Sequence, residues 1–213
     1  DLLDRFHVDP AEIPVMISGG EAVLKNPSNQ KIAESLGFNG RIDQARLRDV
    51  VIVGAGPAGL AAAVYAASEG LDALVVEASS PGGQAGSSSR IENYLGFPTG
   101  ISGQELAGRA YAQVQKFGAN VMIAKSAAEL DCERRPYGVR LDDDAAIPAR
   151  TVIIATGARY RKPSLANLGQ FEGAGVYYNA TFMEEAQLGE GDEVIVVGGA
   201  NSAGQAAVFL AQT

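Results

Sequence analysis

Cysteine and histidine are almost absent from this sequence. Cys132 is the one cysteine and His7 the one histidine among 213 residues. A single thiol cannot form an internal disulfide or a redox-active dithiol pair, so we interpret Cys132 as an ordinary thiol in a strand region. A single imidazole cannot build a metal cluster, and no other metal-ligand spacing is present, so we predict no metal site. The scarcity of cysteine is typical of a reduced, cytoplasmic setting.

Long apolar runs and excess positive charge are also missing. No apolar stretch reaches the ~18 residues that a membrane-spanning helix requires, so we expect no membrane partner. The first ten residues lack the basic start and apolar core of a signal peptide. The formal net charge is −8, which argues against a nucleic-acid partner, because such a surface needs a basic stripe. The sequence begins with Asp1 rather than Met, and we expect it to be part of a longer chain.

Glycine is instead abundant, at 26 residues, and much of it stands in turns next to apolar strands. The apolar runs 50–53 and 73–78 are typical of strands in a parallel sheet, and residues 57–69 between them predict a helix ended by Gly70. A second helix begins after Ser102, with Glu105 at the capping-box position. Its apolar stripe is predicted to contain Leu106, Ala110, Tyr111, Val114 and Phe117. Further strands are predicted over 119–124, 137–141, 151–158 and 192–197.

The first 40 residues predict a smaller unit. Two short apolar runs flank a Gly-Gly turn, as in a β-hairpin. Pro14, just before the first run, is a candidate for a cis proline. Ser28 has the side chain and the position of a helix N-cap. The inner face of that helix is predicted to contain Ala33, Leu36 and Phe38. A polar linker over residues 41–48 follows.

A dinucleotide-binding fingerprint stands at the end of the first apolar strand. Gly54, Gly56 and Gly59 form G-x-G-x-x-G, in which the first allows a tight turn, the second admits a pyrophosphate and the third lets the helix pack closely. The pyrophosphate would face the free N–H groups and the positive dipole end of the following helix. Glu77 ends the next strand, where its carboxylate would accept hydrogen bonds from ribose hydroxyls. The alternative is a purely structural glycine turn.

Five motifs occur in a characteristic order: GAGPAGLAAAVYAA, VVEASSPGGQAG, IENYLGFP, VIIATGA and VVGGANSAGQAA. Together they resemble the low-molecular-weight thioredoxin reductase family of flavoproteins, over most of the chain. In that family the first fingerprint holds FAD and the second holds NADPH, so the resemblance implies an FAD-dependent oxidoreductase that uses NADPH or NADH. It also implies an α/β fold: a Rossmann-like FAD-binding parallel sheet with a small β-meander, and the start of a second, NAD(P)-binding Rossmann-like domain. A homodimer is the assembly that the resemblance suggests.

The resemblance also implies which residues bind cofactor. For FAD these are Gly54, Ala55, Gly56, Pro57, Ala58 and Gly59 at the pyrophosphate, Glu77 at the ribose, Gly83 and Gln84 near the flavin and its ribityl chain, Asn93 near the isoalloxazine, Ala127 near the adenine, and Ala155, Thr156 and Gly157 in a turn beside the cofactor. For the nicotinamide nucleotide they are Gly198, Gly199, Asn201, Ser202 and Ala203. No catalytic side chain is assigned, because the flavin does the chemistry. From the residues alone, the alternatives are that 81–89 is a flexible surface loop, that Asn93 is a turn former and that 155–157 is a simple turn.

Three features depart from the family's pattern. The family has a redox-active Cys-x-x-Cys shortly before the second fingerprint, whereas Asn179 and Phe182 stand at the thiol positions here. Neither can form or resolve a mixed disulfide, so dithiol reduction of thioredoxin by this chain is not expected. Ala200 replaces the second glycine of the second fingerprint, which either weakens NAD(P)H binding or is tolerated by a shift of the loop. The family's returning C-terminal segment does not follow, so we expect a longer protein.

The predicted organisation has four parts: 1–40, which is similar to the last strand-strand-helix portion of a thioredoxin fold; the linker 41–48; the FAD-binding domain, 49–163; and the start of the NAD(P)-binding domain, 164–213. An unrelated hairpin and helix is the alternative for the first part. The favoured function is electron transfer from NAD(P)H to flavin and on to an unknown acceptor. Two alternatives stay open: a thioredoxin-disulfide reductase that uses thiols outside this chain, and a flavin- or nucleotide-binding sensor without turnover.

Overall fold

The computed structural model describes residues 5, 6, 8–19, 22–40, 42–158, 161–178, 180, 188, 189 and 191–211. The chain divides into two compact units, Asp1–Gly157 and Ala158–Thr213. The domain boundary predicted from the sequence, after residue 163, lies slightly later than this division. The roles of the two domains stay predictions. Within the described residues, no helix combines the length and the apolar character that crossing a membrane requires.

The first unit opens with a short 3₁₀ turn, η1 (Pro10–Glu12), and a β-hairpin. Strands β1 (Val15–Ser18) and β2 (Ala22–Lys25) pair antiparallel. The peptide bond between Ile13 and Pro14 is cis. The predicted hairpin is therefore confirmed.

Helix α2 (Asn29–Ser35) follows the hairpin. The hydroxyl of Ser28 accepts a hydrogen bond of 3.3 Å from the backbone N–H of Lys31, which confirms Ser28 as the N-cap. Ala33 is buried as predicted, but Leu36 and Phe38 are 46% and 53% exposed, so their predicted burial is wrong. The helix ends too early for its periodicity to reach them, because Leu36 is the C-cap and Phe38 lies beyond it.

Six strands form the sheet of the first unit, in the order β5-β4-β3-β8-β7-β6. Their bounds are β3 (Arg48–Val53), β4 (Ala73–Glu77), β5 (Asn120–Ile123), β6 (Ala127–Asp131), β7 (Tyr137–Leu141) and β8 (Ala146–Ile154). Strand β4 pairs in parallel with β3 and β5, and β3 pairs in parallel with the second half of β8. Strands β6, β7 and the first half of β8 form an antiparallel meander. The predicted α/β sheet with a small meander is confirmed, although β6 itself was not predicted.

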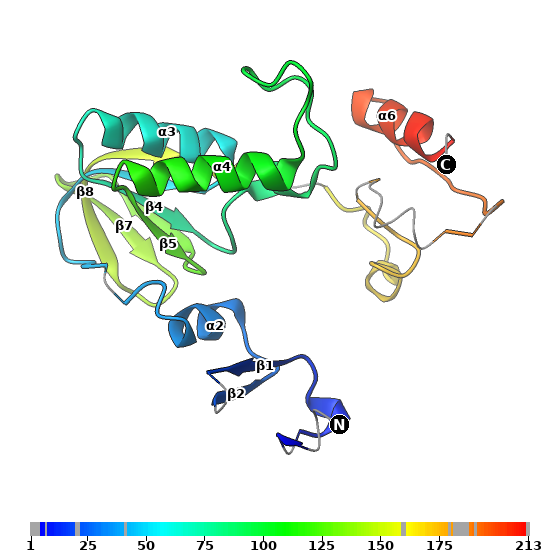
Figure 1. Ribbon diagram of the computed structural model, residues 1–213, viewed down its shortest axis with the longest axis horizontal. Coiled ribbons are helices and arrows are strands. Elements are labelled where there is room, and N and C mark those ends of the chain that lie inside the picture. Colours follow the sequence, from blue (N-terminus) through cyan, green and yellow to red (C-terminus); the bar gives the residue numbers. More distant parts are fainter. Residues whose placement is uncertain are drawn as a thin grey trace. The chain divides into compact units, whose positions relative to one another are not determined.

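Two helices lie together on one face of this sheet (Figure 1). Helix α3 (Pro57–Ser68) starts directly after the Gly54 turn. Helix α4 (Gly103–Lys116) is capped by Ser102, whose hydroxyl accepts a hydrogen bond of 3.1 Å from the N–H of Glu105, as predicted. Phe117 is 40% exposed because it is the C-cap rather than part of the last turn, so its place in the buried stripe is wrong.

The core occupies both faces of the parallel strands. Val50 and Ile52 of β3 pack with the apolar residues of α3 and α4, whereas Val51 packs on the other face with residues of β7 and β8. Successive strand residues point to opposite faces, so a strand that is buried on both sides must be apolar throughout. This double burial fixes the carboxyl ends of β3 and β4, from which the candidate site is built.

The chain that enters the sheet is held by a buried arginine. The guanidinium of Arg48, with 2% of its side chain exposed, contacts Asp72 Oδ1 at 2.9 Å and donates a 2.8 Å hydrogen bond to the carbonyl of Asp43. Asp72 directly precedes β4, so these contacts tie together the amino ends of β3 and β4. Strand β3 begins at Arg48 itself, inside the segment predicted as a linker.

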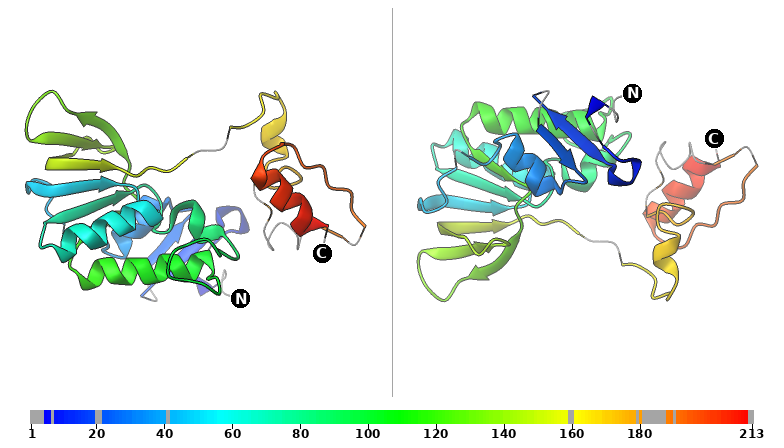
Figure 2. Two further views of the ribbon diagram at one scale, coloured as in Figure 1. Left: turned by 90° about the horizontal axis from the view of Figure 1, so that it is seen from above. Right: turned by 90° about the horizontal axis from the view of Figure 1, so that it is seen from below.

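The second unit contains the 3₁₀ turn η3 (Leu168–Gln170) and helix α6 (Asn201–Leu210), which follows an extended stretch (orange in Figure 2). The predicted strand over 192–197 is wrong: the stretch has no partner strand among the described residues of this unit. Val194, Ile195 and Val197 are 42%, 81% and 87% exposed. A strand exists through hydrogen bonds to a neighbour, and apolar character alone does not supply them.

Candidate dinucleotide-binding sites

The first fingerprint forms a tight turn between β3 and α3. Gly54 has a φ of 104°, a conformation that strongly favours glycine. A methyl group built on Gly54 would lie 2.4 Å from the carbonyl oxygen of Ala155, and one built on Gly59 would lie 1.9 Å from the carbonyl oxygen of Gly54. These two glycines are therefore required by the packing of the turn against β8 and against α3, as the sequence predicts.

Gly56 is not required by the chain's own packing. It is the N-cap of α3, with φ of −72° and ψ of −177°, and no side chain caps the helix. The nearest neighbouring atom to a methyl group built there, the Cα of Gly83, would lie 3.9 Å away, which is ordinary contact. The first N–H groups of a helix have no partner within it, so they and the dipole are available to an anion. The residues present therefore fit the pyrophosphate of a dinucleotide.

Glu77 stands beside this helix start. Its carboxylate accepts a 2.7 Å hydrogen bond from the backbone N–H of Ala55 through Oε2, and a 2.9 Å hydrogen bond from Ser79 N–H through Oε1. The side chain therefore joins the fingerprint to the loop after β4, a role that the sequence analysis did not predict. A carboxylate has about four lone-pair sites, so both oxygens keep the capacity to accept a hydroxyl.

The loop after β4 folds back onto the fingerprint. Gly82 N–H donates a 2.8 Å hydrogen bond to the carbonyl of Ala55, and a methyl group built on Gly83 would lie 3.0 Å from the Cα of Gly56. Gly83 and Gln84 begin the 3₁₀ turn η2 (Gly83–Ser87). Gly83 therefore lies against the fingerprint turn. Residues Gly83–Ser87 form a regular 3₁₀ turn at this position.

The turn over 155–157 also lies at the fingerprint. Ala155 N–H donates a 2.8 Å hydrogen bond to the carbonyl of Val53, and the Ala155 methyl would be 3.5 Å from a methyl at Gly59. Thr156 is exposed, and Gly157 ends the first unit with a φ of 70°.

Asn93 lies on another loop and Ala127 at the start of a strand. Asn93 is exposed in a loop closed by the antiparallel bridge between Ile91 and Ile101. Ala127 begins β6, opposite Leu141 and next to a register shift in the meander. Within the described part of the first unit, no hydrogen bond or ion pair joins either side chain to the fingerprint, so their roles at the cofactor stay predictions.

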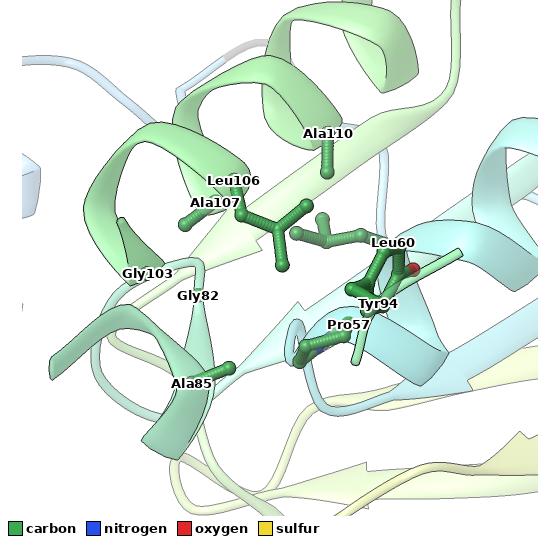
Figure 3. Close-up of a pocket in the computed structure, with 9 residues that line it drawn as sticks. All are labelled: Pro57, Leu60, Gly82, Ala85, Tyr94, Gly103, Leu106, Ala107 and Ala110. Atoms are coloured by element: carbon green, nitrogen blue, oxygen red, sulfur yellow. The ribbon is translucent and has the colours of Figure 1, made fainter. Parts of the chain in front are cut away.

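A small apolar pocket lies between the starts of α3 and α4 (Figure 3). Leu60 of α3 and Leu106 of α4 point toward each other there, and Tyr94 lies across Pro57. The lining residues are Pro57, Leu60, Gly82, Ala85, Tyr94, Gly103, Leu106, Ala107 and Ala110. Because these side chains are apolar apart from the tyrosine hydroxyl, the pocket is a packing contact behind the fingerprint and offers no charge to a phosphate.

The second fingerprint repeats this geometry at α6. Gly198 has a φ of 144°, and a methyl built on it would lie 3.3 Å from the Cβ of Ala203. Ala200 is the N-cap with φ of −99° and ψ of 178°, close to the values of Gly56, and again no side chain caps the helix. Alanine adopts this conformation readily, so Ala200 introduces no backbone strain into the turn. Its methyl group, however, stands at the helix start that Gly56 leaves open. Gly199, Asn201 and Ser202 are exposed around it.

Comparison with known proteins places this geometry in a family. Residues 48–213 match the family described as pyridine nucleotide-disulphide oxidoreductase. The chain is 40% identical over 163 residues to a thioredoxin reductase of Ureaplasma parvum and 36% identical over 169 residues to one of Bacillus subtilis. It belongs to the pyridine nucleotide-disulphide oxidoreductase family. The alignments cover 76% and 79% of this chain but only 51% and 52% of those relatives, so the chain spans about half their length.

Solved structures of this family share the fold. Thioredoxin reductase from Lactococcus lactis superposes with a TM-score of 0.70 at 32% identity, and that from T. acidophilum with 0.68 at 30% identity. Each match covers 78% of this chain and 53% of the other. The resemblance to thioredoxin reductases and the Rossmann-like fold class are thereby confirmed.

The thiol positions of the family cannot be traced here. Asn179 and Phe182 lie outside the described residues. Cys132 is exposed directly after β6 and is the single cysteine of these 213 residues. This half of the family's architecture therefore carries no dithiol of its own.

A hydrogen-bonded cluster in the second unit directly precedes the first thiol position. Lys162 contacts both oxygens of Glu172, at 2.7 and 2.9 Å, and the hydroxyl of Tyr178 donates a 2.6 Å hydrogen bond to Glu172. The hydrogen bonds from Lys162 and Tyr178 hold the pKa of Glu172 below its ordinary value, and Glu172 raises the pKa of Tyr178 to about 12. Tyr178 therefore stays protonated at neutral pH. No spacing in the sequence indicates this cluster, because an irregular loop assembles it.

Proposed function

We propose that this chain forms the FAD-binding site, and the start of the NAD(P)H-binding site, of a flavin-dependent oxidoreductase of the thioredoxin reductase type. The observation that carries the proposal is the first fingerprint. Helix α3 starts at an uncapped Gly56 that the fold itself does not require to be glycine, and Glu77 stands beside it. Family membership supports the proposal. Because the chain spans about half the length of its relatives, the activity of the whole protein is part of the proposal.

The chain's own residues would hold and orient FAD. The N–H groups and dipole of α3 would bind the pyrophosphate, and the remaining lone pairs of Glu77 would accept the ribose hydroxyls. Gly83 and Gln84, in the turn that packs on Gly56, are assigned to the flavin and its ribityl chain. Asn93 is assigned to the isoalloxazine, Ala127 to the adenine, and the 155–157 turn to a position beside the cofactor. When bound, FAD supplies the two-electron transfer between nicotinamide and acceptor.

The second fingerprint is assigned to NADPH or NADH. The uncapped start of α6 offers the same N–H groups as α3, and Gly198 makes the same kind of turn. Ala200 places a methyl group at the position where the pyrophosphate would approach. We infer that Ala200 weakens nucleotide binding without abolishing it, because the backbone of the turn is that of a working site.

The electron acceptor lies outside these 213 residues. One exposed cysteine cannot relay electrons through a dithiol, so the reduced flavin would pass them to oxygen, a quinone, an iron carrier or a separate disulfide. A second candidate function is thioredoxin-disulfide reduction through thiols elsewhere in the protein, which the relatives named thioredoxin reductase favour. The third, a flavin- or nucleotide-binding sensor without turnover, rests on Ala200 and on the missing thiols.

We also propose a cytoplasmic setting and a homodimer. An exposed unpaired thiol, Cys132, is compatible with a reducing compartment. The homodimer is inferred from the family resemblance, and sedimentation of the full-length protein tests it.

The direct test is purification of the full-length protein, identification of its bound flavin, and NADPH and NADH oxidation assays with each class of acceptor. The proposal predicts bound FAD and oxidation of at least one nucleotide. Turnover with thioredoxin disulfide that is lost after thiol alkylation would establish the second candidate. A protein that binds no flavin even when reconstituted with FAD would refute the first two and leave only a nucleotide-binding sensor.

A further inference from the structure

The N-terminal segment reaches the sheet of the first unit through one side chain. The amide nitrogen Nδ2 of Asn39 donates a 2.7 Å hydrogen bond to the carbonyl of Ile123, and the N–H of Ile123 donates a 3.0 Å hydrogen bond to Asn39 Oδ1. The two residues are 84 positions apart and the contact is partly buried. It lies where the chain leaving α2 passes the end of β5 (Figure 1).

This contact occupies the open edge of the sheet. Among the described residues, β5 is the outermost strand on the parallel side, and no strand there pairs with the backbone groups of its outer edge. The side-chain amide of Asn39 presents one donor and one acceptor, as a peptide group does. Asn39 therefore pairs with the last residue of β5 as a neighbouring strand would.

A series of contacts connects the Asn39–Ile123 hydrogen bonds to the fingerprint. Ile123 is paired in register with Glu77. Two residues further on, Lys125 N–H donates a 3.0 Å hydrogen bond to the Glu77 carbonyl, so Ala124, buried with a φ of 57°, is held between two anchors. The Glu77 carboxylate in turn holds Ala55 N–H.

A second route runs through a cleft. Phe38, the residue before Asn39, lines an open cleft of about 560 Å³ together with Ile123, Tyr111 and Gly83. Gly83 packs with its other side on Gly56, at the start of α3. Both routes connect the N-terminal segment to residues assigned to the cofactor.

We propose that Asn39 is a positioning residue of the FAD site: the N-terminal segment completes the edge of the flavin-binding sheet and holds the β5–β6 turn and Glu77 in place. The proposal rests on the assignment of FAD to the first fingerprint. The alternative is that residues 8–39 are only tethered to the sheet, so that removal of the Asn39–Ile123 hydrogen bonds leaves the cofactor site unchanged.

The test uses the full-length protein with Asn39→Ala and Asn39→Asp. The matched control is Gln30→Ala on the preceding helix α2, where the Gln30 amide bonds to Glu34 of the same helix. Asp keeps the acceptor for Ile123 N–H but sets a carboxylate oxygen against the Ile123 carbonyl. The readouts are amide hydrogen exchange over 120–126 and the dissociation constant of FAD. We expect exchange to rise roughly tenfold with Asn39→Ala, and FAD affinity to fall several-fold with both variants, while the control changes neither.

A measurement on the wild-type chain covers the case in which a variant fails to fold. If Asn39 and the cofactor are coupled, linkage requires added FAD to slow exchange at Ile123. Unchanged exchange in Asn39→Ala, faster exchange with unaltered FAD affinity, or no effect of FAD on wild-type exchange would each overturn the proposal. Failure of the proposed function is distinguishable, because it shows as absence of FAD binding by the wild type and the control alike.

Discussion

The carboxylate of Glu77 accepts a 2.7 Å hydrogen bond from the backbone N–H of Ala55. Glu77 ends β4 and Ala55 stands in the turn after β3, so one side chain joins the carboxyl ends of two neighbouring strands. This carboxylate sets the conformation of the fingerprint, and in the proposed function it has a second task, to accept the hydroxyls of a ribose. The two tasks are separable by experiment, because one is present without cofactor.

Glu77→Gln is expected to weaken FAD binding. Glutamine offers one oxygen and one NH₂ group to two N–H donors, so it loses one of the two backbone hydrogen bonds and the negative charge. A hydrogen bond to a charged group contributes about 1.5–3 kcal/mol, so we expect roughly 10- to 100-fold lower affinity in a fluorescence titration with FAD. Glu69→Gln, at the opposite end of α3, is the control. Equal affinities in both variants would contradict the role of Glu77.

Gly59→Ala should mainly lower the stability of the apoprotein, whereas Gly56→Ala should mainly lower its affinity for FAD. A methyl at Gly59 collides with the Gly54 carbonyl, so the apoprotein should lose about 1–3 kcal/mol of unfolding free energy. A methyl at Gly56 has room, and an alanine N-cap costs at most about 1 kcal/mol, but FAD affinity should fall roughly tenfold or more because the methyl enters the pyrophosphate position.

Denaturant unfolding of the apoprotein and FAD titration separate the two effects. Gly108→Ala, in α4 with open space around it, serves as the control and should be neutral or slightly stabilising. A Gly56→Ala protein that binds FAD like the wild type would show that no ligand approaches the start of α3.

Ala200→Gly is the reciprocal change. Removal of the methyl group from the start of α6 should raise affinity for NADPH or NADH, by roughly tenfold if a pyrophosphate contact is restored. Ala207→Gly, exposed on the same helix, lowers helix stability without touching the turn and is the control. If the Ala200→Gly affinity equals that of the wild type, the turn already accommodates the methyl.

The Lys125–Asp143 ion pair should make stability depend on acidity. Lys125 Nζ lies 2.6 Å from Asp143 Oδ2, and the Lys125 side chain is 8% exposed. The hydrogen bond from Lys125 holds the pKa of Asp143 below its ordinary value. Because the folded pKa is the lower one, the stabilisation is complete above the unfolded pKa of about 3.9 and is lost as pH falls through the folded pKa.

Asp143→Asn should therefore lower the melting temperature at pH 7 by a few degrees, and the difference from wild type should shrink below about pH 4. Thermal unfolding followed across this pH range measures it. Asp144→Asn, on the same turn, is the control. A difference that is constant with pH would show that the ion pair does not contribute.

Local patterns predicted the parts of the fold that depend on few neighbours. The sequence correctly predicted the Gly54 turn, the caps at Ser28 and Ser102 and the parallel strands. Turn geometry, helix capping and burial on both faces of a strand each impose a pattern on adjacent residues. The predicted strand at 192–197 failed because a strand needs a partner that the apolar run does not encode. Leu36 and Phe38 failed because a seven-residue helix ends before its periodicity reaches them.

The candidate site was predictable where the fingerprint is contiguous and not where contacts are distant. The sequence predicted the structural roles of Gly54 and Gly59 and the position of Glu77 at the end of its strand. It did not reveal that Glu77 binds Ala55 N–H or that Asn39 pairs with Ile123. Such contacts join segments that are 22 and 84 residues apart and follow no period. The positions Asn179 and Phe182 were set by the resemblance alone.

The most direct test of the account is an anaerobic titration of the full-length, FAD-loaded protein with NADPH and then with NADH, followed by the visible absorbance of the flavin. The account predicts that one nucleotide bleaches the flavin, which would show that both fingerprints work and that Ala200 is tolerated. A flavin that stays oxidised with both nucleotides would contradict it, and would leave a flavin-binding protein that does not use NAD(P)H.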